Sequence, residues 1–200
     1  DNIMPLGAFK AALMGTAGAT VAGDVVLLST TTASNSATAS ITSGITSTYG
    51  EYIFKFYNMN AASDNTDFKF QVESAGTTGY DETMTTTWFR AYHYEDGSSG
   101  QALGYVAGND LAQGTGFQHL IDQVGNGSDE NVAGELHLFN PASTTYVKHF
   151  YGTFVTNGQD NQAVNSYVAG YINTTTAIDA IQFKMAAGNF DGTIKMWGVK

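Results

Sequence analysis

Residues 52–73, YIFKFYNMNAASDNTDFKFQVE, contain a clear pattern of alternating residues. Two runs of alternating residues flank a short cluster of small and polar residues. Large apolar or aromatic residues recur at every second position of both runs: Tyr52, Phe54 and Phe56, then Phe68, Phe70 and Val72. Because successive side chains of a strand point to opposite faces, this period of two predicts strands with one buried and one wet face.

The same alternation recurs along most of the sequence from residue 25 onward. The runs are rich in Thr, Tyr, Phe, Val and Ile, and clusters of Gly, Asn, Asp and Ser separate them. About ten short strands with no helical pattern between them predict an all-β fold, an antiparallel β-sandwich or jelly roll. We expect its core to contain the large residues at alternating positions: Phe54, Phe56, Phe68, Phe70, Leu136, Leu138, Phe183 and Met185.

The last residues, AIDAIQFKMAAGNFDGTIKMWGVK (177–200), have the pattern of a β-hairpin. Two alternating runs flank the sequence Gly-Asn-Phe-Asp-Gly, whose residue types favour turns. We therefore expect residues 181–185 to pair with the run that begins at Ile194. In this interpretation Asp191 is a turn residue, and it is neither a catalytic acid nor a metal ligand.

The N-terminal residues differ from the rest of the chain. Residues 1–23 are rich in small residues and punctuated by glycine, and their apolar stripe covers about three helical turns, which is marginal in isolation. We expect residues 1–23 to form an arm that docks on its own domain or on a neighbouring copy, with a flexible leader as the alternative. Residues 24–200 are expected to form the β-sandwich domain.

The composition restricts the partners of the protein. The chain has 18 Asp and Glu against 8 Lys and Arg, a formal net charge of -10. Nucleic acid is not an expected partner, because its affinity for proteins comes largely from basic groups. The start of the sequence has no signal-peptide pattern, and no apolar run approaches the roughly 20 residues that span a bilayer, so membrane insertion is not expected. The absence of cysteine excludes disulfides and thiolate chemistry.

No motif in the sequence predicts a reaction. His119, His137 and His149 fall within expected strands, and their spacing is not that of a zinc motif. The paired carboxylates lie in or beside turn clusters, where Asp accepts local backbone hydrogen bonds. The segments 64–67 and 125–131 offer oxygen ligands for calcium, but neither matches an EF-hand loop, and a calcium site stays open. We expect no enzyme activity, no catalytic residue and no cofactor.

The densest aromatic segment is WFRAYHY, residues 88–94. Trp88, Tyr92 and Tyr94 are candidate ligand-contacting residues, because aromatic rings spaced along an exposed strand can stack on sugar rings. The alternative is core packing of the face that these three residues share with Arg90.

Three phrases taken in order resemble a known group of proteins. They are STTTASNSATASITSGITSTYGEYIFKFYNMNAASDNTDFKFQV (29–72), GELHLFNPASTTYVKHF (134–150) and TTTAIDAIQFKMAAGNFDGTIKMWGVK (174–200). Their order and spacing are similar to those of β-rich structural proteins of tailed bacteriophages, frequent in marine phages. The likeness covers residues 25–200 approximately, and it brings no catalytic residues.

The resemblance implies a non-enzymatic component of the virion, a capsid decoration or head-fibre protein on the capsid or tail surface. Expected partners are other virion proteins, such as major capsid or tail proteins, and further copies of the chain. A trimer is common among such fibres, although no repeat in the sequence fixes the number. The alternative function is a tail-associated receptor- or carbohydrate-binding module that contacts a host-surface glycan.

Overall fold

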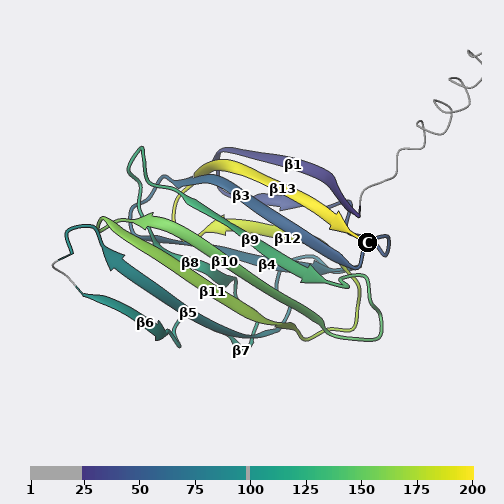
Figure 1. The fold of residues 1–200 in the computed structure, drawn as a ribbon. Coiled ribbons are helices and arrows are strands. Elements are labelled where there is room, and N and C mark those ends of the chain that lie inside the picture. Colours follow the sequence, from purple (N-terminus) through teal and green to yellow (C-terminus); the bar gives the residue numbers. More distant parts are fainter. Residues whose placement is uncertain (1–23, 98–99) are drawn as a thin grey trace, which may run out of the picture.

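The structure, a computed structural model, describes residues 24–97 and 100–200 (Figure 1). The regular elements of these residues are thirteen strands, which confirms the expected all-β class. The strands are β1 (Val25–Ser36), β2 (Ala39–Ile41), β3 (Glu51–Ala61), β4 (Thr66–Ser74), β5 (Met84–Tyr94), β6 (Gln101–Tyr105), β7 (Ala112–Gly114), β8 (Gln118–Val124), β9 (Val132–Phe139), β10 (Lys148–Gly158), β11 (Gln162–Ile172), β12 (Ile178–Met185) and β13 (Phe190–Val199). The expected arm, residues 1–23, lies outside the described residues.

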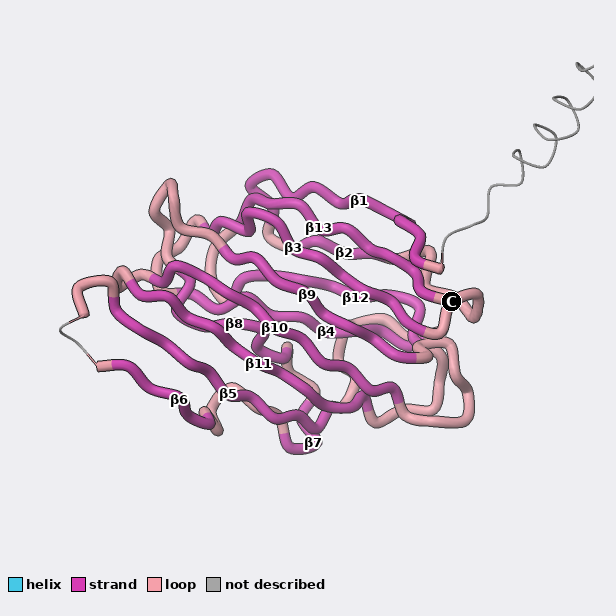
Figure 2. The backbone as a smooth tube through the Cα atoms, in the orientation of Figure 1, coloured by secondary structure: helices cyan, strands magenta, loops and turns pink. Residues whose placement is uncertain are grey.

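The strands form two layers (Figures 1 and 2). The larger layer has the order β1-β13-β3-β9-β10-β11-β5, and β6 and β7 pair with the far edge of β5. The smaller layer has the order β2-β12-β4-β8. One antiparallel pair, Gly158 of β10 with Val124 of β8, joins the two layers. The architecture is therefore the expected antiparallel β-sandwich.

The core lies between the two layers and is rich in phenylalanine. All eight residues that the period-two pattern assigned to the core are buried, with at most 3% of any of them exposed. Phe70 of β4 and Phe150 of β10, for example, meet edge to face across the layers, with ring centroids 5.1 Å apart. The alternation in the sequence thus identifies the inward face of the strands that hold these eight residues.

The expected closing hairpin is wrong. Strand β12 pairs with β4 and β2, whereas β13 pairs with β1 and β3, so the two strands belong to opposite layers. The segment between them passes from one layer to the other and places the buried Phe190 at the start of β13. A period of two determines which face of a strand is buried but not its neighbour, and a short Gly-rich link fits both a hairpin and this crossing.

Asp191 is accordingly a strand residue and not a turn residue. It lies in β13 beside a bulge at Gly192, where the backbone φ is +147°. Its Oδ1 accepts a hydrogen bond of 2.7 Å from the backbone N–H of Asn35 in the neighbouring strand β1. This hydrogen bond joins residues far apart in the sequence, unlike the local contacts of a turn residue.

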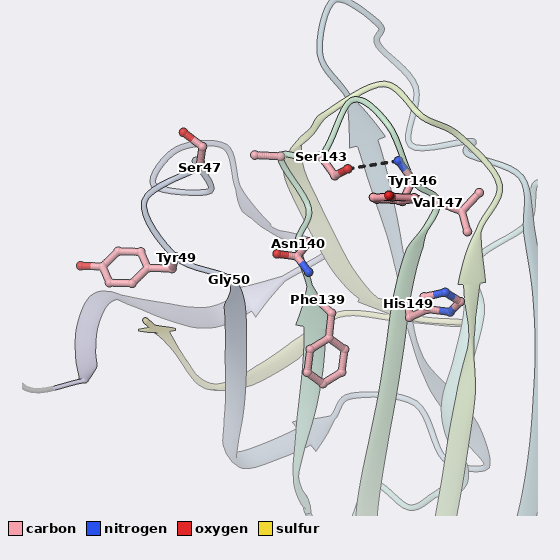
Figure 3. Close-up of a pocket in the computed structure, with 10 residues that line it drawn as sticks. Ser47, Tyr49, Gly50, Phe139, Asn140, Ser143, Tyr146, Val147 and His149 are labelled. Atoms are coloured by element: carbon pink, nitrogen blue, oxygen red, sulfur yellow. Dashed lines mark hydrogen bonds between the residues drawn. The ribbon is translucent and has the colours of Figure 1, made fainter.

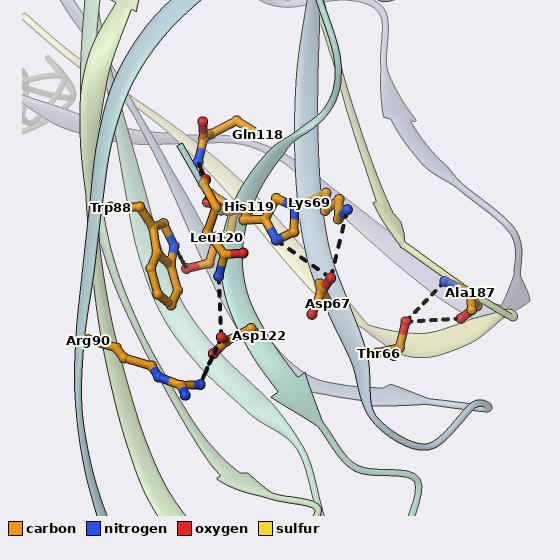
Figure 4. Close-up of polar contacts among 11 residues, drawn as sticks. Thr66, Asp67, Lys69, Trp88, Arg90, Gln118, His119, Leu120, Asp122 and Ala187 are labelled. Carbon is orange, nitrogen blue, oxygen red and sulfur yellow. Dashed lines mark hydrogen bonds and ion pairs between the residues drawn. The ribbon is translucent and has the colours of Figure 1, made fainter. Parts of the chain in front are cut away.

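The interior between β5 and β8 is partly polar (Figure 4). The Arg90 guanidinium donates to both carboxylate oxygens of Asp122, at 2.8 and 2.7 Å. Asn109 donates to Asp122 as well, at 3.2 Å. Both members of the Arg90–Asp122 pair lie mostly out of solvent, with 19% and 12% of their side chains exposed. This pair therefore links the edge of the larger layer to the smaller layer.

Candidate binding surface

The outer face of the larger layer displays aromatic side chains that do not reach the core. On β5, β9, β10 and β11 the odd-numbered residues point outward, because the even-numbered ones alternate with them and face the smaller layer. These outward side chains form two clusters, one near each end of the strand row.

The first cluster centres on His137 of β9. Its imidazole stacks on the ring of Tyr151 in β10, with centroids 4.5 Å apart and planes at 9°, and Phe139 lies 5.8 Å from Tyr151. His137 Nδ1 lies 2.5 Å from Glu51 Oε1, and its Nε2 lies 3.3 Å from Glu135 Oε1. Burial would raise the pKa of Glu135, but His137 and Lys55 together hold this pKa below its usual value.

The second cluster, which we name the apolar edge patch, consists of Phe89, Leu103, Tyr105 and Tyr167. Phe89 and Tyr167 stack with ring centroids 4.9 Å apart, and the strand register sets Phe89 directly opposite Tyr105. Leu103 and Tyr105 are 72% and 57% exposed. All five residues of their strand, β6, are exposed. A contiguous exposed group of large apolar residues is typical of an interaction surface.

A groove opens where two loops meet at one end of the sandwich (Figure 3). The loops are residues 42–50, between β2 and β3, and residues 140–147, between β9 and β10. The groove has a volume of about 670 Å³. We name it the end groove, and its lining includes Ser47, Tyr49, Phe139, Asn140, Ser143, Tyr146 and His149.

One backbone hydrogen bond joins the two loops, and two further bonds brace the second loop internally. The N–H of Asn140, a residue with φ of +44°, donates to the carbonyl of Gly50 at 2.7 Å. The hydroxyl of Ser143 accepts from the N–H groups of Thr145 and Tyr146, at 3.2 and 3.1 Å. These bonds fix the backbone of Tyr146, although 74% of this residue is exposed.

Tyr49 forms a wall of the end groove and also covers the end of β13. Its ring lies edge to face with Tyr52, with centroids 5.9 Å apart. A Cβ on Gly198 would lie 2.6 Å from the Tyr49 ring, so glycine is required at this position for the ring to pack. Tyr49 therefore belongs to the scaffold of the groove.

The structure corrects one of the three candidate aromatic residues. Trp88 is fully buried, and its Nε1 donates to the carbonyl of Leu120 at 3.4 Å (Figure 4), so it does not contact a ligand from the surface. Tyr92 and Tyr94 are half-buried and lie edge to face, with centroids 5.8 Å apart. A ligand-binding role for these two stays a prediction.

For Trp88 the alternative interpretation, core packing, is the correct one, and the candidate residues did not include the opposite face of β5. The even-numbered face, which holds Trp88, packs inward, whereas Phe89 on the other face is exposed. The strand register shows which face of β5 is exposed. Odd-numbered residues of β5, β10 and β11 lie on the same side of the layer, and Tyr151 and Tyr167 on that side point outward. The sequence alone does not give this register, because it does not give the order of the strands.

The histidines of the expected strands are strand residues, in β8, β9 and β10. Within residues 24–97 and 100–200, no group of three or more His, Asp or Glu side chains is arranged to hold a metal ion. The described part of the chain also contains no helix long and apolar enough to cross a membrane.

Comparisons with known proteins identify no family for this chain. No protein-family model and no curated protein matches it. A crystal structure of a protein of unknown function from Bacteroides ovatus is similar over 54% of this chain and 46% of that chain, with 7% sequence identity and a TM-score of 0.29. The match thus spans less than half of that protein, and a likeness this weak carries no argument.

Proposed function

We propose that the protein is a non-enzymatic structural component of a bacteriophage virion, a capsid decoration or head-fibre protein that acts through protein–protein interfaces. The sequence phrases within residues 29–72, 134–150 and 174–200 motivate the virion assignment. The structural observation that carries the interface function is the apolar edge patch.

The apolar edge patch suits contact with another protein for two reasons. First, Leu103 and Tyr105 lie on a strand whose residues are all exposed, so burial against a partner removes a large apolar area from water. Second, the patch residues themselves carry no formal charge in a chain of net charge -10, and the neighbouring Asp110 carboxylate is engaged by the Tyr105 hydroxyl. An uncharged contact lets two acidic molecules approach with less repulsion than their average surfaces would cause.

The interface function is tested by a charge placed in the apolar edge patch. Leu103→Asp in the full chain should lower the mass of the assembly measured by sedimentation, and it should reduce incorporation into purified particles. Ser40→Asp is the matched control, because Ser40 is exposed on β2 in the other layer and Asp can still accept the hydrogen bond from Gln182.

The virion assignment is tested by mass spectrometry of purified particles of the phage that encodes the chain. Detection of the protein at a stoichiometry of many copies per particle supports a capsid decoration or fibre. Absence from the particles, together with a monomeric chain that Leu103→Asp leaves unchanged, would overturn both parts of the proposal.

The second candidate function is a tail-associated receptor- or carbohydrate-binding module. The end groove is the observation that favours it, because this groove combines aromatic rings with side-chain hydroxyl and amide groups. Binding of the purified chain to host cells, reduced by added cell-surface polysaccharide, would support this function over the first.

A further inference from the structure

The end groove continues into a second depression on the outer face of the larger layer. Phe139 and His149 line both, and the second depression, of about 480 Å³, extends over Tyr151, Tyr171 and Thr85. The strand register places His149, Tyr171 and Thr85 side by side on β10, β11 and β5. The two hollows therefore form one continuous track from the loops across four strands.

Several polar side chains in this track have no hydrogen-bond partner among the described residues. Among the described residues, the side chains of Ser47, Asn140, Tyr146 and His149 make no hydrogen bond with the protein, although they line the end groove (Figure 3). Ligand sites typically combine apolar and aromatic walls with a few such groups. The track thus offers hydroxyl, amide and imidazole groups next to the rings of Phe139, Tyr146 and His149.

The track carries no formal charge. None of the described residues that line either hollow is Asp, Glu, Lys or Arg. The chain as a whole has a net charge of -10, so an anionic ligand would be repelled at a distance and would find no cation in the track. A cationic ligand would find no carboxylate lining it. The ligand that suits this lining is neutral.

The backbone beneath the track is not available to an added strand. Strands β9, β10 and β11 each pair on both sides, and β5 pairs with β11 and β7 at this end. An extended peptide usually binds a sheet through free backbone groups at an edge. Recognition in the track therefore depends on side chains, and this disfavours a peptide as the ligand.

We infer that this track binds a neutral oligosaccharide. The apolar C–H face of a pyranose ring packs on the rings of Phe139, Tyr146 and His149, and its hydroxyl groups bond to side chains such as Asn140. The inference rests on the second of the two proposed functions, and it adds the ligand class and the residues. It is independent of the apolar edge patch, because none of the patch residues lines either hollow.

The test is binding of the full chain to a panel of neutral and acidic oligosaccharides, followed by calorimetry with the best binder. Tyr146→Ala and His149→Ala should each weaken binding at least tenfold, because each removes a ring from the track. Tyr57→Ala is the matched control. Tyr57 is a tyrosine on β3, 41% exposed, that lines neither hollow, and its removal should leave the affinity unchanged. Melting curves establish that all three variants are folded.

Each result decides a separate point. Glycan binding that both groove variants leave intact would overturn the track while the carbohydrate-binding function stands. Binding of acidic glycans alone would overturn the neutral ligand class. If no glycan binds, the track and the carbohydrate-binding function both fail. Retention of a peptide from a random library, lost in Tyr146→Ala, would replace the glycan with a peptide.

Discussion

Phe56 of β3 and Phe183 of β12 meet edge to face across the two layers, with ring centroids 5.0 Å apart and planes at 74°. Phe56 also contacts the rings of Phe68 and Phe154, each at 5.4 Å. Rings from both layers thus interlock at one point of the core. Edge-to-face aromatic pairs contribute beyond the area they bury, so this cluster adds to the attraction between the layers.

Phe183→Ala should therefore lower the free energy of unfolding by about 3–5 kcal/mol, because it leaves a cavity between four neighbouring rings. Urea denaturation followed by tryptophan fluorescence measures the change. Tyr146→Ala removes a ring of similar size from an exposed loop and should cost less than about 0.5 kcal/mol. Equal effects of the two substitutions would contradict the assignment of Phe183 to the core.

The Arg90–Asp122 pair should show a strong coupling. Arg90→Leu leaves the Asp122 carboxylate mostly buried with only the Asn109 amide donating to it, and it should cost about 2–4 kcal/mol. Adding Asp122→Leu to that variant removes the unpaired charge and should restore part of the stability. A double-mutant cycle in urea measures this coupling, and strictly additive losses would mean that the pair contributes nothing as a pair.

The stability of the domain should fall in mild acid through His119. Burial, reinforced by the charge of Lys69, lowers the pKa of this imidazole from 6.5 to about 4, although Asp122 acts in the opposite direction. The unfolded chain therefore takes up the proton first, and the stability that is present above pH 6.5 is lost progressively as the pH falls toward 4.

Melting temperatures measured between pH 7 and pH 4 test this behaviour. The carboxylates contribute to the same acid loss, so the informative quantity is the difference in slope between the native chain and His119→Gln. Ser40→Ala, at an exposed position without a titratable side chain, serves as the control and should keep the native slope. An unchanged slope in His119→Gln would show that another group titrates.

Asp191 should tolerate an isosteric change. Asp191→Asn keeps an oxygen that accepts the N–H of Asn35, so the free energy of unfolding should change by well under about 1 kcal/mol. Asp191→Ala loses that oxygen and should cost about 0.5–1.5 kcal/mol. Thermal unfolding of both variants measures the two changes. Equal stabilities of Asp191→Asn and Asp191→Ala would mean that this hydrogen bond does not stabilise the pairing of β1 with β13.

Removal of residues 193–200 should abolish folding. Strand β13 lies between β1 and β3, so its loss leaves both neighbours without a ladder and uncovers a core that Ile194 and Met196 fill. Circular dichroism of the truncated chain measures the loss of strand content. A folded truncated domain would contradict the central position of β13.

For the strands that supply the eight expected core residues, the sequence was sufficient to predict the buried face but not the neighbouring strands. Phe54 and Phe68 are separated by one short link and carry the same pattern, yet β3 and β4 lie in opposite layers. Residues 181–185 of β12 and Ile194 of β13 are likewise close in sequence and lie in opposite layers. Side-chain alternation reports burial, whereas strand order depends on which crossing lets all apolar faces meet, and that is a property of the whole chain.

The candidate site was less accessible to sequence reasoning than the core. The end groove brings Tyr49 next to a distant segment that holds Asn140, Tyr146 and His149, and none of these residues stands out in its own segment. Trp88 was a candidate because large aromatic residues often contact ligands. Its even-numbered position on β5 faces the smaller layer, so its side chain is buried. Only the three-dimensional register separates exposed rings from buried ones.

The pairing of β1 with β13 has a consequence for how the protein is made. Residues near Thr31 find their partners near Ile194, and β1 has no other ladder among the described strands. Contacts between such distant segments slow folding, because a long loop must close before the pairing can stabilise it. On the ribosome the first described strand waits, unpaired, until the last one has left the exit tunnel. The Ser- and Thr-rich part of this strand, residues 29–36, is suited to that interval, since polar residues resist aggregation while an edge is open.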